Sequence, residues 1–157
     1  YLRIFALFAV IFLLSIHSGL RGEVNDLDAA AYFGWYAELQ QINFPQFFER
    51  IKYGGLFYDD GLNRFEVGFS VLGFLAVNLG LSSAQFLFSC AVFSIATKVS
   101  CLFRYFRDPL VLFACIAWYL CWQYLLMEMN AVRIGFALAV VVLGFEQLLL
   151  GRAKALI

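Results

Sequence analysis

Four long stretches of almost uninterrupted apolar residues dominate this sequence and limit what it can fold into. They cover Leu2 to Gly19, Ala84 to Phe103, Pro109 to Met127 and Ala131 to Leu150. A helix needs about 20 mostly apolar residues to cross a bilayer, and each stretch comes close to that length. The chain is 64% hydrophobic and only 14% charged, so a soluble domain of this size would lack a polar surface. We therefore predict an all-α, polytopic integral membrane helix bundle in which residues 1–157 form a single membrane domain.

A fifth apolar stretch, Phe65 to Leu81, is shorter and less regular. It opens on Glu66 and is interrupted by three glycines and by Asn78. It therefore either crosses the membrane or dips in and returns, which gives four or five membrane segments. Interrupted segments of this kind occur where irregular backbone is covered by protein or lines a wet cavity.

Two helix starts carry clear local signals. Ser82 and Gln85 have the spacing of a capping box ahead of the second long stretch. In a capping box, each of the two side chains accepts a hydrogen bond from the backbone N–H of the other residue. Asp108 followed by Pro109 supplies an N-cap and a proline at the first helical position for the third. Both boundaries are predicted from these residues.

The segment from residue 20 to residue 64 is the one large polar part of the chain, and it is rich in aromatic residues. Those at helical spacing predict two short amphipathic helices along the membrane interface. The first is marked by Tyr32, Trp35, Tyr36 and Leu39, and the second by Phe47, Phe48 and Ile51. The aromatic rings fit either an interfacial belt or platforms on which sugars stack.

The two interpretations of 65–81 predict different topologies. If all five stretches cross, the large polar segment and Arg133 lie on opposite faces, and counting arginines and lysines places the large segment in the cytoplasm. If 65–81 returns, the large segment and Arg133 share the external face, while Arg104 and Arg107 stay cytoplasmic. We favour the second arrangement, because short, interrupted segments mark binding sites and the enrichment of basic residues in the cytoplasm is a bias and not a law.

Arg133 is the residue of the last long stretch whose burial in a bilayer costs the most free energy. Its guanidinium cannot be neutralised, and an arginine at the bilayer centre costs about 2.5–3.5 kcal/mol or more. Either it snorkels to the headgroups or it is a fixed cation that lines a polar cavity and binds a carboxylate or phosphate. On a helical wheel it shares a face with Asn130, whereas Gly135 and Ala139 form a stripe of small residues on the other side, which allows close helix packing.

Other charged residues have both a structural and a functional interpretation. Glu66 is either a helix-start carboxylate or a partner of Arg133, and Asp28 is either a helix cap or a general base towards a hydroxyl. Arg21 is an interfacial anchor or an anion ligand. His17 stands alone near a helix end and is expected at the interface. Asp59-Asp60-Gly61 is expected to be a turn and not a metal site.

Several function classes lack support in the sequence. There is no Walker loop, GxSxG, HExxH or nucleotide-binding glycine motif, so no cofactor and no metal are expected. The formal net charge is zero, which gives no reason to expect nucleic acid as a partner.

Three motifs in order resemble the EpsG family of bacterial exopolysaccharide polymerases, which is similar in role to Wzy-type O-antigen polymerases. They are Arg21-Gly22 followed by Asp28-x-x-x-Tyr32, then Glu66-x-Gly68-Phe69, then Asn130-x-x-Arg133-x-Gly135-x-Ala137-x-Ala139. The chain departs from the family pattern in the spacing between Arg21 and Asp28, at Ala29 in place of an aromatic residue, and at Val67 in place of a proline. Family members are about twice this long, so the chain is expected to be the N-terminal half of one.

The resemblance implies a multi-pass enzyme of the bacterial inner membrane that joins oligosaccharide repeat units carried on undecaprenyl pyrophosphate. Asp28, Glu66 and Arg133 are then the catalytic residues, and Arg21, Tyr32 and Asn130 bind substrate. The implied partners are the lipid-linked oligosaccharide, the lipid bilayer, and other polysaccharide export and chain-length proteins. Two other classes stay open: part of a transporter or flippase for an anionic lipid-linked substrate, and a noncatalytic membrane scaffold.

Overall fold

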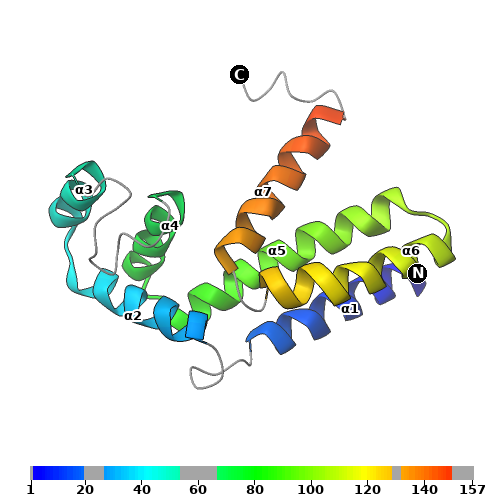
Figure 1. Cartoon of the computed structure of the whole chain (residues 1–157), viewed down its shortest axis with the longest axis horizontal. Coiled ribbons are helices and arrows are strands. Elements are labelled where there is room, and N and C mark those ends of the chain that lie inside the picture. The colour runs from blue at the N-terminus through cyan, green and yellow to red at the C-terminus, as the bar shows by residue number, and fades with distance from the viewer. Residues whose placement is uncertain (1, 20–26, 54–66, 129–131, 150–157) are drawn as a thin grey trace. The chain divides into compact units, whose positions relative to one another are not determined.

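The computed structural model describes residues 2–19, 27–53, 67–128 and 132–149, and these are helical with short connections. The helices in chain order are α1 (Leu2–Gly19), α2 (Leu27–Gln41), α3 (Phe44–Tyr53), α4 (Val67–Asn78), α5 (Ser83–Tyr105), α6 (Pro109–Trp118), the π-helical segment η2 (Tyr119–Glu128) and α7 (Val132–Leu149) (Figure 1). No strand occurs in these parts of the chain. The all-α prediction is confirmed for them, and the four long stretches match α1, α5, α6 with η2, and α7.

By length and composition, the 23-residue helix α5 has what a membrane crossing requires, among the residues described. Shorter apolar helical stretches are Phe5–His17, Val67–Asn78 and Pro109–Tyr124. α4 has 12 residues, which at 1.5 Å per residue is about 18 Å and falls short of the roughly 30 Å hydrocarbon core. The membrane bundle itself stays a prediction.

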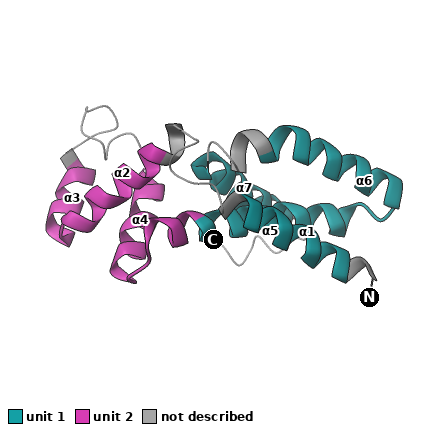
Figure 2. Ribbon diagram, turned by 90° about the horizontal axis from the view of Figure 1, so that it is seen from below, with its two compact units in different colours: residues 1–21, 88–157 teal, residues 22–87 magenta. Residues whose placement is uncertain are grey.

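The chain divides into two compact units, coloured separately in Figure 2. Unit 1 comprises residues 1–21 and 88–157, and unit 2 comprises residues 22–87. The boundary falls inside α5, whose first turn belongs to unit 2. The prediction that residues 1–157 form a single membrane domain stays a prediction, because one domain can contain two compact units.

The predicted caps form as the sequence indicated. The backbone N–H of Gln85 donates to Ser82 Oγ at 3.2 Å, and the N–H of Ser82 donates to Gln85 Oε1 at 2.9 Å. Asp108 Oδ1 accepts from the N–H groups of Leu110 and Val111 at 2.8 and 3.2 Å. Each cap satisfies backbone donors that a helix start leaves without an intrahelical partner.

Gly80 explains where α4 ends. Its φ is +75°, in the left-handed region that glycine adopts without strain. The N–H of Leu81 donates to the carbonyl of Ala76, and that of Gly80 to the carbonyl of Val77. This hydrogen-bond pair is a Schellman motif, which terminates the helix and leads the chain to Ser82.

Unit 2 has an aromatic core. The predicted stripe of α2 is buried there and packs against α4 and the first turn of α5, so it does not face outward to a bilayer as the interfacial interpretation expected. The stripe consists of Tyr32, Trp35, Tyr36 and Leu39. Trp35 stacks on Phe69 with ring centroids 5.3 Å apart. α3 keeps Phe44 and Phe48 exposed, as an interfacial helix would.

Tyr36 links α2 to the turn after α4. Its hydroxyl donates to the carbonyl of Leu81 at 2.8 Å. Burial raises the pKa of this hydroxyl, so it remains a protonated donor at neutral pH. The contact holds the Gly80 turn against α2.

Unit 1 is built around α5. On one face of α5, Ala91, Ile95 and Val99 form a core with Tyr119 and Tyr124 of η2. Side chains of α1 pack against this core: Leu7, Val10, Ile11 and Leu14.

The other face of α5 meets α7. The hydroxyl of Ser94 donates to the carbonyl of Gly135 at 2.7 Å, and Ser94 is fully buried. Gly135 and Ala139 are buried, which confirms that the small-residue stripe allows close packing. Lys98 of α5 is buried as well.

Candidate functional site

The structure describes part of the predicted site. Arg133 and Tyr32 lie in its described residues, in unit 1 and unit 2 respectively. Asp28 belongs to the first turn of α2, but its side chain lies outside the described part. Arg21, Glu66 and Asn130 also lie outside it. Whether these six residues meet is therefore a prediction and not an observation.

Arg133 is the second residue of α7 and is half-buried. Its neighbour Val132 is fully buried, and the Ser94 hydrogen bond to Gly135 fixes the same helical turn. A guanidinium at this place is partly covered by protein and lies at a helix N-terminus, where backbone N–H groups also favour an anion. This position suits a cation that binds phosphate.

Contacts inside unit 1 determine which helix ends lie together. Tyr124, in the middle of η2, hydrogen-bonds to Leu14 and His17 in the last turns of α1. Along α5 and α7, Ser94 meets Gly135 near the start of α7, and Arg104 meets Glu146 near its end. α5 and α7 therefore run parallel. The end of α1, the end of η2 and the start of α7 occupy one end of unit 1 (Figure 1).

This arrangement bears on the topology. The chain leaves unit 1 after α1 and returns to it in α5, and both points belong to the helix end at which α7 begins. If α1 and α5 span a membrane, the intervening segment that contains α4 returns to the face from which it left. The contacts therefore agree with the arrangement in which 65–81 does not cross.

Tyr32 is buried in unit 2. Its ring packs edge-on against Phe69, with centroids 6.1 Å apart and planes at 65°, and only 4% of the residue is exposed. This environment gives it a packing role. Contact with a substrate stays a prediction for this residue.

The sequence did not indicate the contact between His17 and Tyr124. The Nδ1 atom of His17 lies 2.8 Å from the hydroxyl of Tyr124, and this hydroxyl donates to the carbonyl of Leu14 at 2.8 Å. The two residues are 107 positions apart, so no local pattern could have paired them. Tyr124 belongs to η2, and π-helical turns are frequent at functional sites.

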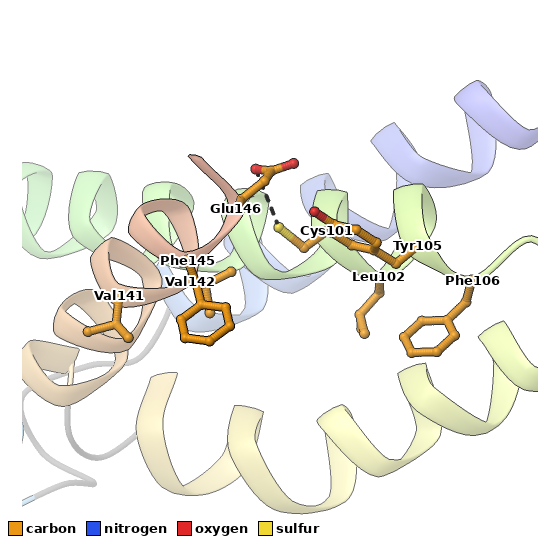
Figure 3. A pocket seen from close by; sticks show the side chains of 8 residues that line it. All are labelled: Cys101, Leu102, Tyr105, Phe106, Val141, Val142, Phe145 and Glu146. Atoms are coloured by element: carbon orange, nitrogen blue, oxygen red, sulfur yellow. Dashed lines mark hydrogen bonds between the residues drawn. The ribbon is translucent and has the colours of Figure 1, made fainter. Parts of the chain in front are cut away.

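The far end of unit 1 holds an ion pair and a pocket. Glu146 of α7 is buried and pairs with Arg104 of α5, whose side chain is 60% exposed. Cys101 donates weakly to the other carboxylate oxygen, at 3.9 Å. A pocket of about 370 Å³ lies beside them. Figure 3 shows its walls, which come from α5 and α7 with Phe106 after α5: Cys101, Leu102, Tyr105, Phe106, Val141, Val142, Phe145 and Glu146.

This pocket does not suit a pyrophosphate. Its walls are almost entirely carbon, and the one carboxylate that lines it would repel an anion. It also lies at the end of α7 opposite Arg133. Among the described residues, no group of three or more His, Cys, Asp or Glu side chains could hold a metal ion.

Comparison with known proteins decides the family. The model of the EpsG family matches residues 4–157. The chain belongs to the EpsG family. No curated protein and no solved structure matches it.

Membership of the EpsG family confirms the resemblance that the three motifs indicated. It marks the chain as a polysaccharide-related membrane protein. In this EpsG family chain, Arg133 is half-buried, and the contact between His17 and Tyr124 lies at the same end of unit 1.

Proposed function

We propose that this protein is a multi-pass polymerase of the bacterial inner membrane. It joins oligosaccharide repeat units carried on undecaprenyl pyrophosphate during exopolysaccharide, capsule or O-antigen synthesis. The observation that carries the proposal is the family match over residues 4–157. The position of Arg133, half-buried at the start of α7, supports it.

The reaction is a glycosyl transfer. A hydroxyl oxygen of the acceptor sugar bonds to the anomeric carbon of the donor sugar, and the bond from that carbon to the pyrophosphate oxygen breaks. The electron pair stays on the departing pyrophosphate, and the hydroxyl proton passes to a base. Such a step needs cations at the leaving group and a proton acceptor at the hydroxyl.

We assign the residues by the charge that each contributes. Arg133 binds the leaving pyrophosphate in bidentate fashion, as a guanidinium does best, with Arg21 as a second cation. Asp28 or Glu66 is the carboxylate near the acceptor hydroxyl. Tyr32 and Asn130 contact the substrate.

The topology inside unit 1 supports one shared face for these residues. The chain passes between the two units at the end of unit 1 where α7 begins. On our proposal this face is external, and Arg104 and Arg107 at the other end of α5 are then cytoplasmic.

The test is a reconstituted elongation assay. The full-length protein is placed in liposomes with purified lipid-linked repeat units and no nucleotide sugar, and product length and release of the lipid pyrophosphate are measured. Elongation supports the polymerase. Movement of the substrate across the bilayer without elongation would instead indicate a transporter, and neither activity would indicate a scaffold.

Arg133 variants test the assignment within the same assay. Arg133→Gln should lower the rate about 10²–10³-fold, as loss of one group that stabilises developing negative charge does. Arg133→Lys should lie between, because a lysine keeps the charge and loses the bidentate geometry. The matched control is Arg107→Gln, an exposed arginine at the other end of α5, which should keep the rate within about twofold. Unchanged elongation by Arg133→Gln would contradict the assignment.

A further inference from the structure

The imidazole of His17 has a fixed partner on only one of its two nitrogens among the contacts that the structure describes. Nδ1 faces the hydroxyl of Tyr124 at 2.8 Å, and the ring centroids are 5.9 Å apart. His17 itself is exposed near the end of α1, whereas Tyr124 is buried. The buried tyrosine therefore holds an exposed histidine ring.

The hydrogen bonds determine which nitrogen carries the proton. A tyrosine hydroxyl has one proton, and here it lies between the hydroxyl oxygen and the carbonyl of Leu14, at 2.8 Å, because a carbonyl can only accept. Toward His17 the hydroxyl oxygen must then accept. Nδ1 therefore carries the proton that it donates to Tyr124.

The consequence for the neutral ring concerns Nε2. In a neutral imidazole one nitrogen is a donor and the other is an acceptor. With the proton on Nδ1, Nε2 presents its lone pair. A hydrogen-bond partner that fixes the tautomer in this way is how proteins prepare a histidine to accept a proton.

The position of this lone pair matches the proposed reaction. His17 lies near the end of α1, and its ring contacts Tyr124 of η2. η2 packs against α7, whose second residue is Arg133. Both residues therefore belong to the same end of unit 1. The π-helical turns of η2 contribute to the geometry, because they place Tyr119 and Tyr124, five residues apart, in the same buried cluster.

We infer that His17 is a catalytic residue, the base that takes the proton of the acceptor hydroxyl at Nε2. This rests on the proposed function. As the hydroxyl oxygen bonds to the anomeric carbon and the pyrophosphate leaves with the electron pair, the proton moves to Nε2 and the ring becomes an imidazolium. The imidazolium then releases that proton to water. Tyr124 is the positioning residue.

A direct test reads the tautomer without any activity. With ¹⁵N-histidine labelling of the full-length protein in lipid nanodiscs, the ring signals that disappear in His17→Gln are those of His17. At a pH where the spectrum shows a neutral ring, Nδ1 should carry the proton and Nε2 should not. In Tyr124→Phe the Nε2-protonated form should grow, while Tyr105→Phe, the same change at the far end of α5, should leave the spectrum as it was. A parent ring protonated on Nε2 would overturn the inference.

The elongation assay tests the catalytic part. His17→Gln should reduce the rate about 10²-fold or more, the contribution of a general base, while the protein still binds lipid-linked repeat units. Tyr124→Phe should cause a smaller loss of rate with little change in KM, and Tyr105→Phe should cause none. If His17→Gln elongates at the parent rate while Arg133→Gln does not, the polymerase stands and the role of His17 is wrong. If the parent itself fails to elongate, the proposed function is wrong, and this role falls with it.

Discussion

Two glycines of α4 offer a controlled test of how unit 2 is packed. An ideal Cβ at Gly73 would overlap the indole ring of Trp35 and lie 2.9 Å from the Cδ1 atom of Leu39. A Cβ at Gly68 would meet nothing within 4 Å. Both glycines are in the same 12-residue helix. Replacing each with alanine raises the helix propensity at both positions, but only at Gly73 does the added methyl group meet packed side chains.

The expected free energies follow from this contrast. Glycine to alanine within a helix gains about 0.5–1 kcal/mol, so Gly68→Ala should stabilise unit 2 slightly. At Gly73 the same gain is set against overpacking, which costs about 1–3 kcal/mol. The indole of Trp35 is 2% exposed and Leu39 is fully buried, so neither can move aside cheaply. The two variants should therefore differ by about 1–3 kcal/mol, with Gly73→Ala the less stable.

The measurement is unfolding of both variants and the parent in the same detergent, followed by near-ultraviolet circular dichroism. This signal reports the packing of aromatic rings, including the stacked pair Trp35 and Phe69. Equal stability of the two variants would refute the reasoning, because it would mean that α2 and α4 do not approach closely at Gly73.

Two further predictions concern unit 1. Asp108→Ala should lower stability by about 1 kcal/mol, because the backbone N–H groups that its side chain caps lose their acceptor; thermal unfolding against Asp108→Asn, which keeps an acceptor, checks this. Glu146→Gln should weaken the contact between α5 and α7, and the double change Arg104→Glu with Glu146→Arg should restore part of it. The rate of disulfide cross-linking between cysteines placed on the two helices measures this contact. No recovery in the double variant would argue against the ion pair.

Local signals in the sequence predicted the helices well. Ser82 with Gln85, and Asp108 with Pro109, act over three residues or fewer and fixed the starts of α5 and α6. The apolar stretches gave α1, α4 and α7 to within a few residues, and aromatic residues at helical spacing indicated α2 and α3. A cap depends on neighbours in the chain, so one sequence suffices to recognise it.

Interactions between distant residues were less accessible. The aromatic stripe of α2 has the same period whether it packs on lipid or on protein, and the structure uses Tyr32 and Trp35 for packing against Phe69. The bond between His17 and Tyr124 spans 107 positions, and Tyr124 lies in the π-helical segment η2. Amphipathic pattern alone cannot distinguish these cases, because it reports periodicity and not the partner.

In the proposed topology, the segment that contains α3 and the start of α7 are on the external face of the membrane, and the α5–α6 turn is on the cytoplasmic face. Single cysteines at Gln46 of α3 and at Arg107, both exposed, can be introduced in a cysteine-free background. Intact cells are then treated with a membrane-impermeant thiol reagent, with permeabilised cells as the control. We predict that the cysteine at position 46 is labelled from outside and that the one at position 107 is labelled only after permeabilisation. Labelling of both positions from the same side would mean that residues 65–81 cross the membrane and would contradict the account.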